Sequence, residues 1–318
     1  MNARTVVTNI IEVEGLTKDY KQLRALNNLS FQVRQGEILG LLGPNGSGKT
    51  TAINCILSLL RFSSGSVKIF GKEMHPNAFD IKRRLGVVFQ DVAVFDELTV
   101  AQNLEYFTGL YVSDKRERAQ MIDAAVKLVG LQDYLKFRPK QLSGGLLRRL
   151  NLACGIAHKP DLIFLDEPTV AVDPQSRNNI LDGIVTLRDQ GATVVYTTHY
   201  MEEVEQICDR IIILDKGQII AQGTINELKQ LSDIEEKVTL QGVELSPELK
   251  EKLESDPQIE SVTSRNRMVQ LVYRHGQNHV STLIAQLRQA GIAYESIYSE
   301  RPTLNDVFLQ LTGKELRD

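Results

Sequence analysis

GPNGSGKT, at residues 43–50, matches the phosphate-binding pattern G-x-x-x-x-G-K-[ST] in full. It follows an apolar run at 37–42 that predicts a buried strand, and it opens an apolar-periodic segment that predicts a helix. Glycines in such a loop let backbone N–H groups curl around phosphate oxygens, and the helix N-terminus adds positive potential. The sequence therefore predicts a phosphate-binding loop made of Gly43, Pro44, Asn45, Gly46, Ser47, Gly48, Lys49, Thr50 and Thr51.

The chemistry of this loop depends on two side chains. Lys49 is expected to reach the β- and γ-phosphates of a nucleotide, and the Thr50 hydroxyl is expected to bind Mg²⁺. Because both the pattern and its strand-to-helix context agree, a chance glycine-rich turn is the weaker alternative.

LIFLDEP, at residues 162–168, predicts a second element of the site. Its apolar residues indicate a strand in a sheet, and Asp166 and Glu167 follow at the carboxyl edge, where such sheets bind ligands. Adjacent strand residues point to opposite faces, so the two carboxylates need different roles. We expect Asp166 to serve Mg²⁺ through water and Glu167 to act as the general base on water. Alone, the pair would be better explained as two solvated acids.

Two further strand ends carry candidate ligands. Gln90 ends GVVFQ and His199 ends VVYTTH, so both are expected at the same sheet edge as the phosphate loop. A glutamine amide can bind Mg²⁺ or its water. A histidine can donate a hydrogen bond to the γ-phosphate.

Composition limits the possible classes. The chain has 318 residues, 42% hydrophobic and 24% charged, with a net charge of −3 and a pI near 6.0, which argues against a general nucleic-acid binder. Three scattered cysteines fit neither a disulfide framework nor a zinc site. No signal peptide or apolar run of membrane-spanning length is visible. We therefore expect a soluble, cytoplasmic chain whose membrane role comes through a partner.

The order of elements predicts an α/β architecture in two domains. Strands and helices alternate through residues 1–224, as in a mainly parallel sheet covered on both faces, with a helical subdomain at about 91–158. A linker is expected at 225–235. Residues 236–318 follow a βαββαβ order with a last helix, which predicts a small α+β, ferredoxin-like domain.

QLSGGLLRRL, at residues 141–150, poses a separate problem. Gly144 and Gly145 stand behind Ser143 at the expected start of a helix, where each glycine costs about 1 kcal/mol relative to alanine in a helix interior. Some requirement for bare backbone is expected there.

The order of these motifs resembles the ATPase subunit of ABC transporters throughout residues 10–224. The resemblance implies a P-loop NTPase, RecA-like core with a β-subdomain and an inserted helical subdomain. It implies that Tyr20 stacks on adenine; the alternative is that Tyr20 is an ordinary tyrosine at the end of a strand. It also implies that Gln90 couples the nucleotide site to a transmembrane partner. It also implies that Ser143, Gly144 and Gly145 bind the γ-phosphate of ATP held by the opposite subunit, that Asp173 crosses the dimer interface, and that His199 is the switch histidine.

Two positions depart from the family pattern. The motif LSGG at 142–145 resembles the family's signature, which usually ends in a glutamine that Leu146 replaces here. The segment VAVD at 170–173 begins with valine where serine often stands. Neither change removes a catalytic group, so both sites of a homodimer are expected to be active. The ending at 301–318 is similar to ATPases that serve drug, antibiotic and lipid exporters, which implies a C-terminal dimerisation or regulatory domain; a solubilising extension is the alternative.

The resemblance implies an ATP-hydrolysing subunit that uses ATP and Mg²⁺ to drive export. Its partners would be a separate transmembrane permease and a second ATPase, in a homodimer or a heterodimer with a paralogue, at the cytoplasmic face of the membrane. An importer ATPase is an alternative, although its C-terminal domain is usually a small β-barrel. A soluble ABC ATPase would usually show two cassettes, a long coiled coil or zinc cysteines. A non-catalytic ATP sensor would not need Lys49, Glu167 and His199 together.

Overall fold

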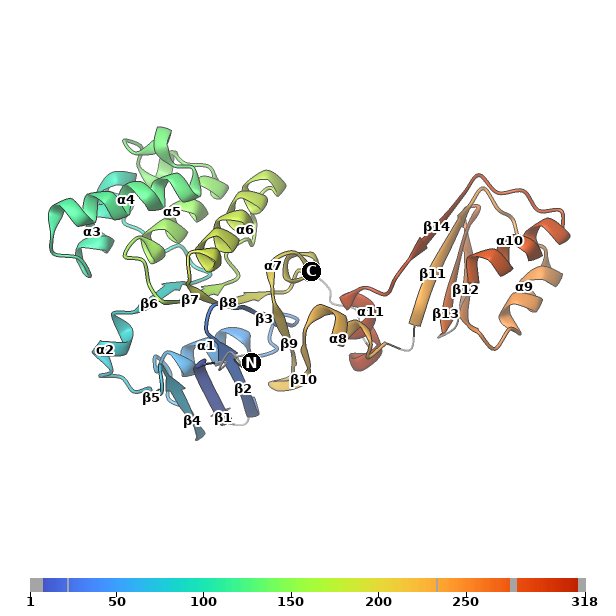
Figure 1. The fold of residues 1–318 in the computed structure, drawn as a ribbon, viewed down its shortest axis with the longest axis horizontal. Coiled ribbons are helices and arrows are strands. Elements are labelled where there is room, and N and C mark those ends of the chain that lie inside the picture. Colours follow the sequence, from blue (N-terminus) through green and yellow to red (C-terminus); the bar gives the residue numbers. More distant parts are fainter. Residues whose placement is uncertain (1–7, 22, 233, 275–278, 314–318) are drawn as a thin grey trace, which may run out of the picture. The chain divides into compact units, whose positions relative to one another are not determined.

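The computed structural model describes residues 8–21, 23–232, 234–274 and 279–313. The chain divides into two compact units, one ending at Thr224 and one spanning Ile225–Leu316. The first unit contains two sheets and the second contains one, and each unit has its own core (Figure 1).

The centre of the first unit is a six-stranded sheet with the order β10-β9-β3-β8-β7-β6. Its strands are β3 (Ile38–Leu42), β6 (Leu85–Val88), β7 (Leu162–Asp166), β8 (Thr193–Thr198), β9 (Arg210–Asp215) and β10 (Gln218–Gly223). All neighbours are parallel except β9 and β10. Every residue of β3, β7 and β8 is buried, as expected for parallel strands covered on both faces. Their carboxyl ends therefore share one edge.

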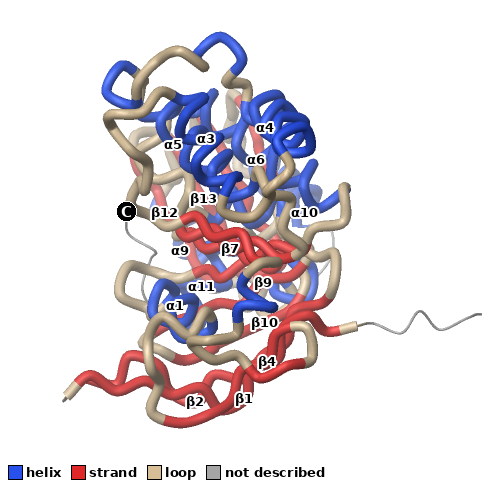
Figure 2. Tube along the Cα trace, turned by 90° about the vertical axis from the view of Figure 1, so that its left-hand side faces the viewer, coloured by secondary structure: helices blue, strands red, loops and turns tan. Residues whose placement is uncertain are grey.

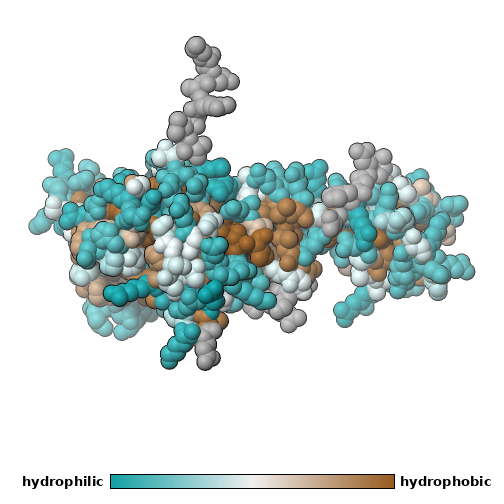
Figure 3. Space-filling view, turned by 90° about the horizontal axis from the view of Figure 1, so that it is seen from below, coloured by the Kyte–Doolittle hydropathy of each residue, from teal (hydrophilic) through white to brown (hydrophobic). Residues whose placement is uncertain are grey.

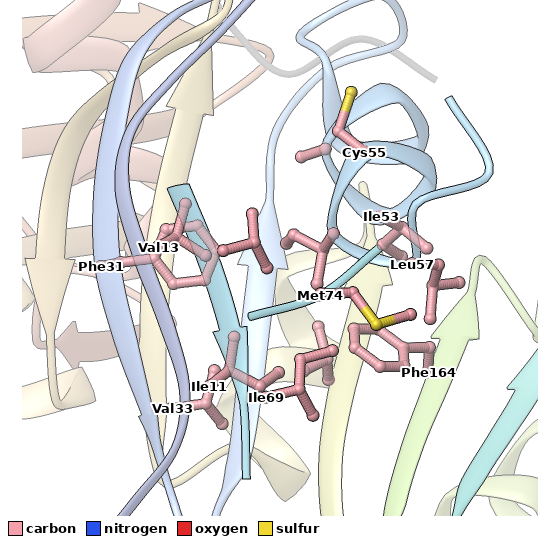
Figure 4. Packing of buried hydrophobic residues seen from close by; sticks show 14 of the residues in the cluster. Ile11, Val13, Phe31, Val33, Ile53, Cys55, Leu57, Ile69, Met74 and Phe164 are labelled. Atoms are coloured by element: carbon pink, nitrogen blue, oxygen red, sulfur yellow. The ribbon is translucent and has the colours of Figure 1, made fainter. Parts of the chain in front are cut away.

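One face of this sheet is covered by α1 (Lys49–Ile56) and by an antiparallel sheet with the order β2-β1-β4-β5. That sheet consists of β1 (Asn9–Tyr20), β2 (Leu23–Arg34), β4 (Ser64–Ile69) and β5 (Lys72–Glu73). Figure 2 shows α1 above β1, β2 and β4. In the shared core, Phe164 of β7 lies near Leu57 and Met74 (Figure 4). This cluster fixes the helix that carries the phosphate loop.

The other face is covered by α5 (Gly144–Ile156), α6 (Pro174–Asp189) and α7 (Met201–Ile207). Gly40 of β3 allows α7 to approach closely, because a Cβ there would lie 2.8 Å from the Cys208 Sγ. The remaining helices of the unit are α2 (Phe79–Lys82), α3 (Val100–Gly109), α4 (Lys115–Val129), η1 (Gln132–Tyr134) and η2 (Pro139–Gln141). α3, α4 and α5 pack on one another within the expected helical segment. A capping box at Thr99 and Gln102 starts α3.

The second unit is an antiparallel sheet with the order β12-β13-β11-β14. Its elements are α8 (Ile225–Lys229), β11 (Ile234–Gln241), α9 (Pro247–Glu254), β12 (Ile259–Arg265), β13 (Met268–Arg274), α10 (His279–Gln289), β14 (Ser296–Glu300) and α11 (Leu304–Thr312). The first and third strands of the βαββαβ unit are central, as in a ferredoxin-like fold. α9 and α10 each contribute two leucines to its core.

Residues 225–235, for which the sequence predicts a linker, contain α8 and the start of β11. α8 packs on α11 inside the second unit. In the view of Figure 3, hydrophilic side chains cover most of the visible surface of both units. No helix among the described residues is both long and apolar enough to cross a membrane.

Candidate active site

The phosphate loop joins β3 to α1 and is shaped by glycines. Gly46 and Gly48 have φ of 81° and 108°, a left-handed conformation that glycine adopts without a Cβ penalty. A Cβ on Gly43 would lie 2.2 Å from the Leu214 carbonyl oxygen, so a side chain does not fit there. Gly48 is the N-cap of α1 and provides no side-chain cap, which leaves the first N–H groups of the helix available to an anion.

Lys49 is buried at the base of this loop. Its Nζ donates hydrogen bonds to the carbonyl oxygens of Gly43 and Pro44, at 2.7 and 3.2 Å. It also lies 3.1 Å from the Glu167 Oε1. The ammonium group therefore lies between the loop and the carboxylate at the end of β7.

Asp166 and Glu167 lie in different surroundings. Asp166 ends β7, and its Oδ1 accepts a 2.6 Å hydrogen bond from the Thr197 hydroxyl. Glu167 lies past the strand with φ of 47°, and its N–H donates to the Thr197 hydroxyl and carbonyl oxygens. The prediction that strand alternation sends the two carboxylates in different directions is therefore wrong, because Glu167 is not part of β7. A left-handed turn at Glu167 separates the two carboxylates.

His199 lies on the other side of Glu167. Its Nδ1 is 3.4 Å from the Glu167 Oε2, and the side chain is 9% exposed. Nδ1 has no hydrogen-bond partner within the part of the chain that the structure describes. One carboxylate thus faces both an ammonium group, that of Lys49, and an imidazole, that of His199.

A cleft of about 480 Å³ opens over these groups. Its lining residues are Tyr20, Leu23, Arg24, Ala25, Asn45, Gly46, Gly48, Lys49, Thr50, Thr51, Gln90, Glu167 and Lys216. Tyr20 is 43% exposed, and the Lys18 Nζ lies 4.7 Å from the centre of its ring. Gln90 lies two residues past the end of β6, and its carbonyl oxygen accepts a hydrogen bond from Arg148. The cleft thus collects most of the predicted phosphate, adenine and metal ligands.

Two basic residues in the cleft were not predicted. Lys216 follows β9 at the same sheet edge as the other ligands, and that position could have indicated it. Arg24 lies just past the β1–β2 turn, where its Nε bonds the Asp19 Oδ1 at 2.8 Å. No sequence pattern that we considered marks Arg24.

The expected Mg²⁺ ligands are not all equally accessible. Thr50 and Gln90 line the cleft, whereas Asp166 is 2% exposed and is absent from the lining. Among the described residues no group of three or more histidine, cysteine, aspartate or glutamate side chains could hold a metal. The donor set suits a magnesium ion held by one hydroxyl, one amide, waters and nucleotide phosphates.

The signature glycines lie outside this cleft, at the start of α5. Ser143 is the N-cap, and its Oγ accepts a 3.3 Å hydrogen bond from the Leu146 N–H. Gly145 is buried, and a Cβ there would lie 2.4 Å from the Ser176 Oγ. Gly144 is different: it is exposed, and the nearest atom to its Cβ position is the Ala171 oxygen at 3.9 Å. Packing among the residues that the structure describes therefore requires glycine at 145 and not at 144.

Asp173 lies next to the signature as the N-cap of α6. Its Oδ1 accepts a 2.9 Å hydrogen bond from the Ser176 N–H. This backbone donor lowers the pKa of the exposed Asp173 carboxyl below its ordinary value. Asp173 and the signature serine thus start two adjacent helices.

Residues 26–170 match the ABC transporter family. Residues 223–312 match the family described as ATP-binding protein DrrA1-3-like, C-terminal domain. The second match covers most of the ferredoxin-like unit.

Full-length relatives give the same assignment. The chain is 34% identical over 313 residues to the linearmycin resistance ATP-binding protein LnrL of Bacillus subtilis (strain 168), covering 97% of this chain and 100% of that protein. It is 35% identical to the daunorubicin/doxorubicin resistance ATP-binding protein DrrA of Streptomyces peucetius, covering 99% and 96%. It is also 35% identical to a Nod factor export ATP-binding protein I of Ralstonia nicotianae, covering 98% and 96%.

A solved dimer of the ATP-binding cassette MJ0796, bound to ADP and Pi, superimposes with a TM-score of 0.62 at 28% identity. It covers 67% of this chain and 98% of that one. Fold and site together define an ATP-hydrolysing cassette with a P-loop NTPase core. The chain belongs to the ABC transporter family, as an ATP-binding subunit with a DrrA-like C-terminal domain. The sequence-based prediction of a transport-coupled ATPase of the exporter type is confirmed.

Proposed function

We propose that the chain hydrolyses ATP to drive the export of a drug-, antibiotic- or lipid-like cargo through a separate transmembrane permease. The names of the relatives support this cargo class, since they describe linearmycin resistance, daunorubicin/doxorubicin resistance and Nod factor export. The working location is the cytoplasmic face of the membrane, on the permease.

Each group around the cleft has one role in this proposal. The backbone of the phosphate loop and Lys49 hold the β- and γ-phosphates, and Tyr20 stacks on adenine. Glu167 takes the proton from the attacking water, and His199 donates a hydrogen bond to the γ-phosphate. Mg²⁺, when bound by Thr50, Gln90 and, through water, Asp166, neutralises charge on the phosphates.

We propose that the active form is a dimer in which each ATP contacts the signature of the opposite chain. Gly144 is exposed at a helix N-terminus, and no packing against the described residues of its own chain requires a glycine there. A bare backbone in that position suits an anion brought by a second copy. Ser143 supplies a hydroxyl beside it.

An apolar groove next to the cleft supports a permease partner. The groove holds about 380 Å³ and is lined by apolar side chains that include Phe89, Phe107 and Leu110. Phe89 lines this groove and the next residue, Gln90, lines the nucleotide cleft. This adjacency carries the proposal, because a permease segment in the groove would sense the segment that reaches the nucleotide.

The experiment places a charge in the groove. Leu110, which is 64% exposed, is changed to aspartate, and Phe79, which is 65% exposed and outside the groove, is changed to aspartate as the matched control. With the permease co-expressed, Leu110→Asp should lose membrane association and cargo export while the free chain keeps its ATP turnover. Phe79→Asp should keep all three. Export that survives Leu110→Asp would contradict the docking site, and turnover without any permease association in the unaltered chain would favour a soluble ATPase.

A further inference from the structure

Glu203, on α7, is a buried carboxylate outside the nucleotide cleft. It is 2% exposed, and burying such a group is costly unless hydrogen bonds satisfy it. Three hydroxyl groups do so. The Thr169 hydroxyl donates to Oε1 at 2.7 Å. The hydroxyls of Tyr196 and Thr198 donate to Oε2 at 2.7 and 2.6 Å. Such a fully satisfied network fixes the positions of the groups that it joins.

The donors come from two segments, since Thr169 lies in a loop whereas Tyr196 and Thr198 both belong to β8. Thr169 lies in the loop that follows Glu167, and Thr198 immediately precedes His199. Thr198 is the last residue of β8, where the turn to His199 begins, whereas Tyr196 lies inside the strand. The Thr198 hydroxyl also accepts a 3.0 Å hydrogen bond from the Tyr200 N–H, so it holds the backbone on both sides of His199. Glu203 therefore joins the two loops that carry the proposed base and the proposed switch histidine.

Arg177 of α6 adds an ion pair to this network. Its Nε lies 3.5 Å from the Glu203 Oε1, and its guanidinium lies 4.6 Å from the centre of the Tyr200 ring. That ring in turn lies 4.2 Å from the His199 ring. The network thus contacts the imidazole by a second route, through packing.

We infer that Glu203 is a positioning residue for ATP hydrolysis. Its carboxylate holds the loop after Glu167 and the turn at His199 in one fixed relation, which maintains the 3.4 Å approach of the two side chains. The inference rests on the proposed roles of Glu167 and His199. It adds a residue that is not among those lining the nucleotide cleft.

The experiment removes the hydroxyls one at a time in the full chain, with Mg²⁺ and ATP. Thr169→Val and Thr198→Val each remove the bond that ties one of the two segments to Glu203. Tyr196→Phe removes a donor to the same carboxylate and a 3.3 Å contact with the Thr169 hydroxyl, but it leaves the bonds of Thr169 and Thr198 to Glu203 in place. We expect the two threonine variants to lower kcat by about 10- to 100-fold with KM for ATP nearly unchanged, because a misplaced group loses only transition-state interactions. Tyr196→Phe should lose comparable thermal stability but keep kcat within about two-fold of the unaltered chain.

Substitutions of Glu203 itself test whether a conservative variant restores turnover. Glu203→Ala should lose turnover, and Glu203→Gln, which keeps one acceptor oxygen and adds a donor, should recover part of it. If Tyr196→Phe loses as much kcat as the threonine variants, or none of the three loses any, the network is only structural and the inference fails. His199→Ala serves as the reference: normal turnover there would show that the proposed role of His199 is wrong, and the inference would fall for that separate reason.

Discussion

The phosphate loop and the signature helix both present backbone at a helix N-terminus, yet their surroundings differ. The phosphate loop faces a cleft lined by Lys49 and Glu167, and the Glu167 carboxylate lies 3.1 Å from Lys49 and 3.4 Å from His199 of the same chain. The signature has Ser143 and an exposed Gly144, and neither of them is among the residues that line the cleft. One site carries chemistry within a single chain. The other provides an anion-binding surface that, in our account, serves a second chain.

The phosphate-loop side should show the largest effect. Glu167→Gln keeps the shape of the side chain and removes its basicity, so turnover should fall by roughly 10²- to 10⁴-fold, the usual contribution of general-base catalysis. ATP binding should persist. The control is Glu202→Gln, because Glu202 is exposed on α7 and should leave turnover intact. Steady-state hydrolysis and equilibrium nucleotide binding measure the two quantities, and near-normal turnover in Glu167→Gln would assign the base to another group.

The two signature glycines should respond in opposite ways to alanine. Gly145→Ala places a Cβ 2.4 Å from the Ser176 Oγ, so overpacking should lower the free energy of unfolding by about 1–3 kcal/mol. Gly144→Ala meets open space and should leave stability equal or raise it by up to about 1 kcal/mol. Turnover should nevertheless fall in Gly144→Ala.

Thermal unfolding and ATP hydrolysis of both variants separate these effects. A Gly144→Ala protein that is as active as the unaltered chain would remove the argument that its bare backbone meets a phosphate.

The smallest expected effect concerns pH on the signature side. The Ser176 N–H lowers the pKa of Asp173 in the folded chain, so folding favours the ionised carboxylate. This stabilisation is present above the ordinary aspartate pKa of about 3.8 and is lost as pH falls through the lower folded value. Asp173→Asn keeps an N-cap without the charge. The unaltered chain should therefore melt at a higher temperature than Asp173→Asn at neutral pH, and the gap should close in acid. A gap that is constant with pH would contradict the assignment.

Most residues of the cleft could be predicted from the sequence, because most of them lie in a segment that directly follows an apolar stretch recognisable as a strand. The phosphate loop, Glu167 and His199 all follow apolar strands, and parallel strands end at one edge. It could not find the left-handed turn at Glu167 or the buried partners of Glu203, because both depend on how distant segments pack. The ferredoxin-like order was predictable from element types alone, whereas the packing of α8 on α11 was not.

The signature is a second case in which the sequence alone does not show what each residue contacts. Two adjacent glycines in the sequence indicate only that bare backbone is needed. Only the structure shows that the close approach of Ser176 requires glycine at 145, whereas nothing in the described chain requires glycine at 144. A substitution at 144 therefore tests the interface without disturbing the fold, and one at 145 does not.

In the proposed dimer, each ATP is held between Lys49 of one chain and the signature of the other. Lys49→Ala removes the phosphate clamp, and Gly144→Asp places a carboxylate where the γ-phosphate would lie, a repulsion that is strong in a closed site. Each variant alone should trap no ATP. A mixed dimer would contain one site with both defects and one site with neither.

The two variants, separately tagged, both carrying Glu167→Gln to block turnover, are co-expressed and purified through both tags. Retained nucleotide per dimer is then measured, with the Glu167→Gln protein without other changes as the reference. Our account predicts one trapped ATP in the mixed dimer and two in the reference. A mixed dimer that traps none while the reference traps two would show that the signature acts only within its own chain.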